Sequence, residues 1–112
     1  MTNTISVHTT FANLDEAKKI ANFLAKEKLI ACANLLPCQS VYLWKGDIEE
    51  AEEVVAIFKT IEEKYERLEK EIKSQSSYES PAIFVTKIDD ESPETSDWLF
   101  KVLREGGGHG NA

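Results

Sequence analysis

Cysteine is scarce in this chain of 112 residues, which contains only Cys32 and Cys38. Two cysteines are too few for a small secreted scaffold that depends on disulfides. They stand six positions apart, so an extended strand would separate them by about 20 Å, whereas a disulfide needs Cα atoms within about 7 Å. Unless Pro37 turns the chain back sharply, we expect two unbridged, partly buried thiols.

Long apolar runs are also missing. No segment approaches the ~20 residues that a membrane-spanning helix needs. The N-terminal segment, MTNTISVHTTF, lacks the basic start and the apolar centre of a secretory signal peptide. These absences favour a cytoplasmic protein with no membrane partner.

Basic residues are in the minority. Thirteen Lys and Arg residues stand against 20 Asp and Glu residues, which gives a net charge of −7, and the basic residues form no stripe. Nucleic-acid binding is therefore not expected, because neutralising phosphates requires a basic surface. The acidic surface is interpreted mainly as solvated, although it would also attract cations weakly.

Catalytic and metal-binding motifs are absent from the sequence. It has no glycine-rich phosphate loop, no Gly-x-Ser-x-Gly, no His-Glu-x-x-His and no Cys-x-x-Cys. Both arginines, Arg67 and Arg104, fall in predicted helices, whereas acylphosphatase chemistry needs an arginine in a phosphate-binding loop. His8 is interpreted as a hydrogen-bonded residue of a strand, and His109 lies in a glycine-rich tail. We therefore expect no enzymatic activity and no obligatory cofactor.

The most informative segment is a pair of apolar runs joined by a polar turn. The first run is Leu29–Trp44 and the second is Val54–Thr60, with Lys45-Gly46-Asp47 between them. Glycine can take the positive φ that tight hairpin turns require. Apolar residues occupy both parities of the second run, which is typical of a strand covered on both faces.

The other segments alternate between strand and helix patterns. Strands are predicted at residues 4–10 and at Ala82–Ile88. Capping boxes predict two helices, the first after Asn13 with Glu16 and the second after Thr60 with Glu63, ending near Ser74. Ser92-Pro93 predicts the start of a short last helix.

This order of elements predicts an α+β fold, namely a ferredoxin-like βαββαβ sandwich with an extended central hairpin and a C-terminal helix. Residues 1–104 are expected to form one domain, and residues 105–112 a flexible glycine-rich tail. Two helices cover only one face of such a sheet, yet the central strands are apolar on both. Long hairpin arms would also leave unpaired edges. Both features predict partner copies in a closed, symmetric assembly.

The hairpin, together with several positions after it, resembles the sequence pattern of a known family. The matching positions are Ala31-Cys32-Ala33-Asn34, then Ser40, Tyr42, Trp44 and Gly46, then Glu53, Lys59-Thr60, Tyr78-Glu79, Pro81 and Trp98. In this pattern the chain resembles the CutA divalent-cation-tolerance family. The resemblance implies a homotrimer with a non-enzymatic role in tolerance of, or response to, divalent metal ions, copper especially. Ser76-Ser77 departs from the His-Pro pair that usually stands there, which weakens any metal role of that loop.

Candidate site residues follow from these patterns, each with an alternative. We expect an inter-subunit cleft or interface to contain Tyr42, Trp44, Glu53, Lys59, Tyr78 and Glu79. The two aromatic residues of the hairpin are interpreted as interface or core, with ligand binding as the alternative. Lys59 would either bind an anion near a helix N-terminus or pair with a carboxylate such as Glu53 of another subunit. Cys32 is the best single ligand for copper or another divalent cation.

A second function class stays open at this point. PII signalling proteins and ACT domains have comparable folds and assemble through their sheets. A PII/ACT-like regulatory module would bind a small molecule between subunits, near Lys59, Tyr78 and Glu79. A purely structural role is the third alternative, since one fold hosts many functions.

Overall fold

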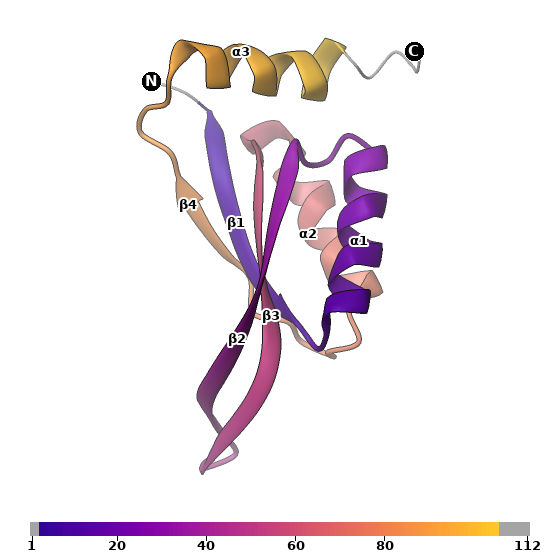
Figure 1. The fold of residues 1–112 in the computed structure, drawn as a ribbon, viewed down its shortest axis with the longest axis vertical. Coiled ribbons are helices and arrows are strands. Elements are labelled where there is room, and N and C mark those ends of the chain that lie inside the picture. Colours follow the sequence, from indigo (N-terminus) through magenta and orange to yellow (C-terminus); the bar gives the residue numbers. More distant parts are fainter. Residues whose placement is uncertain (1–2, 106–112) are drawn as a thin grey trace.

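The computed structural model describes residues 3–105 and contains one four-stranded antiparallel sheet with the strand order β2-β3-β1-β4. Helices α1 and α2 cover one face of this sheet, and α3 lies across one end of it (Figure 1). The ferredoxin-like prediction is confirmed. The elements are β1 (Thr4–Phe11), α1 (Leu14–Lys26), β2 (Cys32–Trp44), β3 (Asp47–Ile61), the 3-10 turn η1 (Glu62–Lys64), α2 (Tyr65–Gln75), β4 (Phe84–Lys87), α3 (Pro93–Phe100) and the π-helical turn η2 (Lys101–Glu105).

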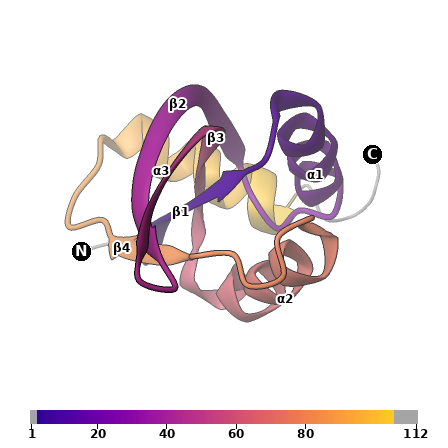
Figure 2. The same ribbon diagram turned by 90° about the horizontal axis from the view of Figure 1, so that it is seen from below.

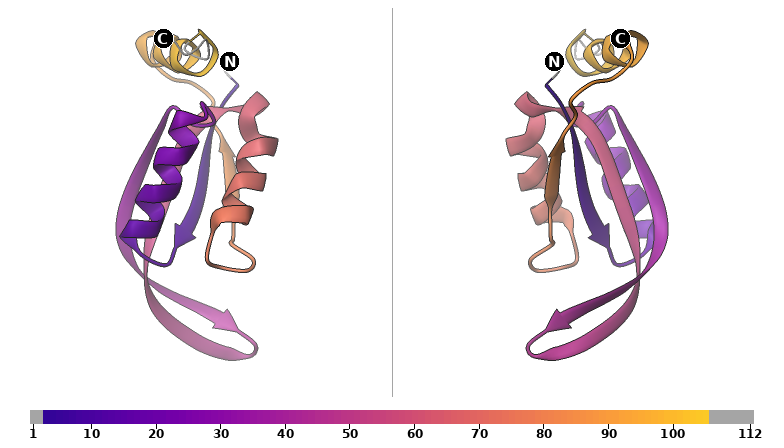
Figure 3. Two further views of the ribbon diagram at one scale, coloured as in Figure 1. Left: turned by 90° about the vertical axis from the view of Figure 1, so that its right-hand side faces the viewer. Right: turned by 90° about the vertical axis from the view of Figure 1, so that its left-hand side faces the viewer.

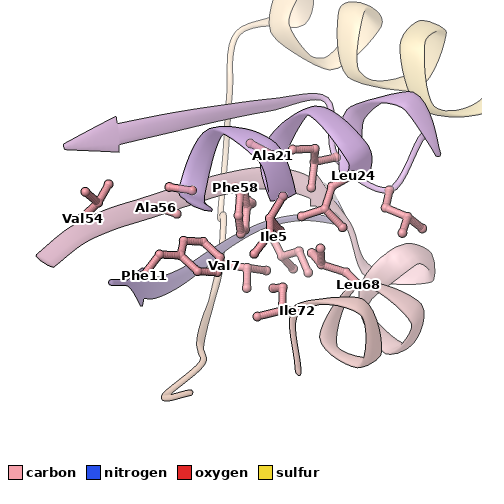
Figure 4. Packing of buried hydrophobic residues seen from close by; sticks show 14 residues of the cluster. Ile5, Val7, Phe11, Ala21, Leu24, Val54, Ala56, Phe58, Leu68 and Ile72 are labelled. Carbon is pink, nitrogen blue, oxygen red and sulfur yellow. The ribbon is translucent and has the colours of Figure 1, made fainter. Parts of the chain in front are cut away.

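The core lies between the sheet and the two helices (Figure 4). Alternate residues of β1 and β3 point toward the helices because side chains along a strand alternate between faces. Phe11 and Phe58 are both fully buried, and their ring centroids lie 6.4 Å apart. The apolar faces of α1 and α2 pack on these strands, and Leu24 of α1 and Leu68 of α2 are among the fully buried residues.

Asn13 begins α1 as predicted. Its side-chain Oδ1 accepts a hydrogen bond from the backbone N–H of Glu16 at 2.9 Å, which satisfies one of the free donors of the first turn. The reciprocal half of the predicted capping box does not form. Both carboxylate oxygens of Glu16 accept hydrogen bonds from Ser77 instead.

Replacing Asn13 with alanine should lower the free energy of unfolding by about 1 kcal/mol, because the N–H of Glu16 loses its acceptor. Urea unfolding of the wild type and the variant measures this difference. Asn22→Ala is the matched control: the Asn22 side chain only donates to the carbonyl of Lys18 within α1. A cost for Asn13→Ala no larger than that of Asn22→Ala would contradict the capping role.

Two predicted boundaries were wrong. The capping box at Thr60 does not exist, because β3 continues to Ile61 and the buried Thr60 hydroxyl donates to the carbonyl oxygen of Leu29 at 2.7 Å. Helix α2 begins only after η1, with no side-chain cap at Lys64. Strand β4, Phe84–Lys87, is shorter at both ends than the predicted Ala82–Ile88, and the carbonyl of Ala82 accepts a hydrogen bond from the Thr9 side chain.

The central hairpin is longer than the rest of the sheet. Strands β2 and β3 pair without interruption from Cys32–Lys59 to Trp44–Asp47. Pro37 does not interrupt this pairing, since a proline is tolerated in an edge strand. The pairing of β1 with β3 ends at Phe11–Val54, so the hairpin overhangs the sheet (Figure 1). Its two-residue turn has positive φ at Lys45 (51°) and Gly46 (85°), which confirms the predicted role of the glycine.

Among the described residues, α1 and α2 leave the second face of the sheet uncovered (Figure 3, right), and α3 reaches only its end, where Leu99 packs with Ile61. Strand register assigns to this face the residues of β2 and β3 that alternate with the core positions, including Val55 and Ile57, both half-buried, and Phe84 of β4, which is 66% exposed. We call this surface the open face. At the overhanging end of the hairpin, Leu43 is 76% and Ile48 70% exposed. A single chain therefore leaves apolar strand surface in water, as the sequence predicted.

The predicted glycine-rich tail lies outside the described residues, apart from Glu105 at the end of η2. His109 lies outside them as well.

Candidate functional site

Polar side chains converge where the loop between α2 and β4, residues 76–83, passes the hairpin. We call this segment the 76–83 loop; it and the base of the overhanging hairpin can be followed from below in Figure 2. The hydroxyl of Tyr78 donates to the Glu53 carboxylate of β3 at an O···O distance of 2.5 Å. This contact joins two of the predicted site residues that stand 25 positions apart in the chain.

The surroundings of Tyr78 favour its neutral form. Partial burial raises the pKa of Tyr78 above the ordinary tyrosine value, and the hydrogen bond and negative charge of Glu53 raise that pKa further. Tyr42 and Glu16 contribute in the same direction. At neutral pH the phenol is therefore a fixed donor to Glu53.

Substituting Tyr78 with phenylalanine should lower the free energy of unfolding at pH 7 and lower it less at alkaline pH. The pKa of Tyr78 is higher in the folded protein than in the unfolded chain, so its contribution is complete below about pH 10, the unfolded value, and is lost as pH rises further. Denaturant unfolding of both proteins at pH 7, 9 and 11 measures this difference. A constant difference across the series would contradict the assignment.

A groove of about 580 Å³ lies beside this contact, between the start of α1 and the hairpin. Cys38 and Glu53 line it, and the strand register places these two residues directly opposite each other. The Cys38 Sγ lies 3.6 Å from the hydroxyl oxygen of Ser40. Sequence reasoning did not include Cys38 among the site residues, because only the register of β2 on β3 places its thiol beside a carboxylate.

Lys59 and Cys32 lie at the other end of the hairpin. They are opposite each other in the strand register, six residues along β3 from Glu53 and thus about 20 Å away. The Lys59 Nζ donates to the Asn34 side chain at 2.7 Å. The predicted position of Lys59 at a helix N-terminus was wrong, because β3 continues past it to Ile61.

Trp44 and Glu79 take no part in the hydrogen bond between Tyr78 and Glu53. Trp44 is at the hairpin turn, 58% exposed, with the Lys45 Nζ 5.6 Å from its ring centroid. Glu79 is exposed in the 76–83 loop. The structure thus brings together Tyr78 and Glu53, with Tyr42 near enough to influence the phenol and Glu79 next to Tyr78 in the loop. Lys59 and Trp44 lie elsewhere.

Within residues 3–105, no group of three or more His, Cys, Asp or Glu side chains is arranged to hold a metal ion. Cys32 and Cys38 are both free thiols. The Nε2 of His8 lies 3.2 Å from the Ser6 hydroxyl, which agrees with its predicted structural role. Among the same described residues, no helix has the length and apolar character needed to cross a membrane.

These features define a class: small ferredoxin-like α+β proteins with an overhanging central hairpin and an open apolar sheet face. Within that class, residues 5–102 match the model of the CutA1 divalent ion tolerance protein family. The chain therefore belongs to this family, and the resemblance found in the sequence is confirmed.

Individual relatives agree with this assignment. The divalent-cation tolerance protein CutA of Pyrococcus horikoshii is 43% identical over 101 residues, which are 90% of this chain and 99% of the relative. The CutA protein of Thermotoga maritima is 42% identical over 95 residues, 85% of this chain and 94% of the relative. The structure of the periplasmic divalent cation tolerance protein CutA from Archaeoglobus fulgidus superposes with a TM-score of 0.88 at 35% identity, covering 90% of this chain and 99% of that one.

Proposed function

We propose that this chain acts as a homotrimer in the tolerance of divalent metal ions, copper especially, and that it does so without catalysis. The observation that carries this proposal is the apolar strand surface that a single chain leaves exposed. Leu43, Ile48 and Phe84 are 76%, 70% and 66% exposed, and an apolar side chain in water forgoes about 1.5–3 kcal/mol relative to burial. Identical copies closing around a symmetry axis would bury that surface.

The mass of the particle in solution tests the assembly. Multi-angle light scattering at micromolar concentration should give three times the mass of one chain. A mass of one chain at that concentration would exclude the trimer, and a mass of two would replace it with a dimer. The family membership of the chain would stand in either case.

One chain does not supply a complete ligand set for copper. Cys32 is a soft thiol ligand, but its cross-strand neighbour is Lys59, and the described residues contain no three-ligand cluster. Three-fold symmetry would supply what one chain lacks by bringing copies of Cys32 toward one another. The ion is therefore proposed as cargo of the assembly and not as an obligatory cofactor of the fold.

Copper titration should distinguish the two thiols. Cu(I) and Cu(II) added to the wild type and to Cys38→Ser should bind, whereas Cys32→Ser should lose most of the binding. Equal binding by all three proteins would remove Cys32 from the site. Negligible binding by the wild type would remove the metal proposal while leaving the assembly unaffected.

We propose the cytoplasm as the location of this protein, because two cysteines are too few for a small secreted scaffold that depends on disulfides. The relative from Archaeoglobus fulgidus is named periplasmic, so the compartment needs its own measurement. Fractionation of cells that produce the chain, followed by immunodetection, measures the compartment. Detection of the protein outside the cytoplasm would contradict the proposed location.

The alternative is a PII/ACT-like regulatory module that binds a small molecule between subunits. The groove beside Glu53 and Cys38 favours it, since ligand sites are concave and carry a few convergent polar groups. A thermal-shift screen with nucleotides, amino acids and organic acids tests this class. Stabilisation by one of them that is lost in Glu53→Gln would support the module, and no stabilisation by any of them argues against it.

A further inference from the structure

The 76–83 loop is held to three different elements of the fold. Ser77 contacts Glu16 of α1, Tyr78 contacts Glu53 of β3, and the carbonyl of Ala82 accepts a hydrogen bond from the Thr9 hydroxyl of β1 at 2.8 Å. Four of the eight loop positions, residues 77, 79, 80 and 82, are exposed. The loop is thus fixed by directed polar contacts more than by burial.

The contact between Glu16 and Ser77 is the most directed of the three. The backbone N–H of Ser77 donates to Glu16 Oε2 at 2.7 Å, and the Ser77 hydroxyl donates to Glu16 Oε1 at 2.8 Å. A carboxylate that accepts two short bonds from one residue fixes both the position and the orientation of that residue. Serine provides both donors, whereas alanine would provide one.

Glu16 is available for this contact because it is not used in the helix cap. In a complete capping box its carboxylate would bond to the backbone N–H of Asn13. Asn13 makes its own half of the cap through Oδ1, while the Glu16 carboxylate reaches a residue 61 positions away. The start of α1 is therefore tied directly to the residue before Tyr78.

The next step runs from Ser77 to Tyr78. The backbone N–H of Tyr78 donates to the Ser76 hydroxyl at 3.1 Å, so the residues on either side of the Glu16 contact are also constrained. Because the backbone at Ser77 is fixed, the Tyr78 side chain is held where its hydroxyl reaches the Glu53 carboxylate. Without this restraint, the exposed loop would gain conformational freedom, and the bond from Tyr78 to Glu53 would have to restrain the loop alone.

We propose that Glu16 is a positioning residue: by clamping Ser77 it holds the 76–83 loop so that the Tyr78 hydroxyl stays on Glu53. The clamp therefore controls whether Glu53, which lines the groove opposite Cys38, is occupied by the phenol or free to accept another donor. This proposal concerns contacts within one chain and does not depend on the proposed trimer or on copper.

Glu16→Ala and Ser77→Ala test the proposal on the full chain, with two measurements. Amide hydrogen exchange at Ser77 and Tyr78 should accelerate roughly tenfold in Glu16→Ala, because a hydrogen bond to a charged acceptor is lost at an exposed site. The alkaline titration of Tyr78, isolated as the difference between each protein and the same protein carrying Tyr78→Phe, should move toward the ordinary tyrosine value. Ser77→Thr keeps both donors and should behave as the wild type.

Asp15→Ala is the matched control, since it removes one negative charge from the same helical turn, while both donors of Ser77 bond to Glu16. It should leave both measurements unchanged. The proposal is overturned if Glu16→Ala keeps wild-type exchange and wild-type titration of Tyr78. It is equally overturned if Ser77→Ala, which keeps the Glu16 charge and removes the hydroxyl donor, leaves both measurements at the wild-type values, because the charge of Glu16 and not the clamp would then explain the effect of Glu16→Ala.

Discussion

Replacing Phe58 with alanine should lower the free energy of unfolding by about 3–5 kcal/mol, the usual cost of removing a buried aromatic side chain. Phe58 is fully buried in the second half of β3 and packs against Phe11 of β1, in the cluster that the sheet forms with helices α1 and α2 (Figure 4). Removing its side chain would leave a cavity. The backbone of β3 cannot move in to fill that cavity, since β3 is paired with a strand on each side at this position. Against typical total stabilities of about 5–15 kcal/mol, such a loss is large.

Urea unfolding at one fixed protein concentration measures this effect, because stability of an assembly depends on concentration. Phe58→Leu is the conservative control, since leucine refills part of the volume and should cost only about 1 kcal/mol. A cost below 1 kcal/mol for Phe58→Ala would mean that the region around β3 repacks freely. That outcome would contradict the close packing of Phe58 with Phe11.

The fold was predictable where hydrophobic periodicity is strong. Both parities of Val54–Thr60 are apolar, which correctly predicted a central strand with two neighbours, and Gly46 correctly predicted the turn. The predicted helix start at Thr60 was wrong because the Thr60 side chain had two possible hydrogen-bond partners. A threonine hydroxyl can cap a helix or bond to a distant carbonyl, and the buried carbonyl of Leu29 took it here. Local sequence does not reveal which partner tertiary structure will supply.

The sequence proposed candidate site residues one by one, and it did not predict how they are arranged. The family pattern selected Glu53 and Tyr78, and the structure joins them. It also selected Lys59, which the strand register separates from Glu53 by six positions. Ser77 and Glu16 were not selected for each other, because a contact across 61 positions depends on where the 76–83 loop crosses α1. Only the assembled sheet and helices determine that crossing.

Replacing Phe84 with glutamate should separate the proposed trimer into single chains and so reduce the mass of the particle threefold. Phe84 is 66% exposed in the isolated chain, and the register of β4 on β1 places it beside His8 on the open face. The fold of one chain should tolerate the change, because the new carboxylate can remain in water. In the proposed assembly the same carboxylate would be buried against apolar strands without a partner, which costs several kcal/mol per copy. Three copies multiply that cost.

Light scattering of wild type and variant at equal concentration measures the mass, and circular dichroism verifies that the variant stays folded. Leu14→Glu is the matched control: it also places an acid at a partly exposed leucine, but in the first turn of α1, away from the open face. Its mass should equal that of the wild type. If Phe84→Glu remains a trimer while folded, the open face is not the interface. The exposed apolar residues of the hairpin end, Leu43 and Ile48, would then have to carry the association alone.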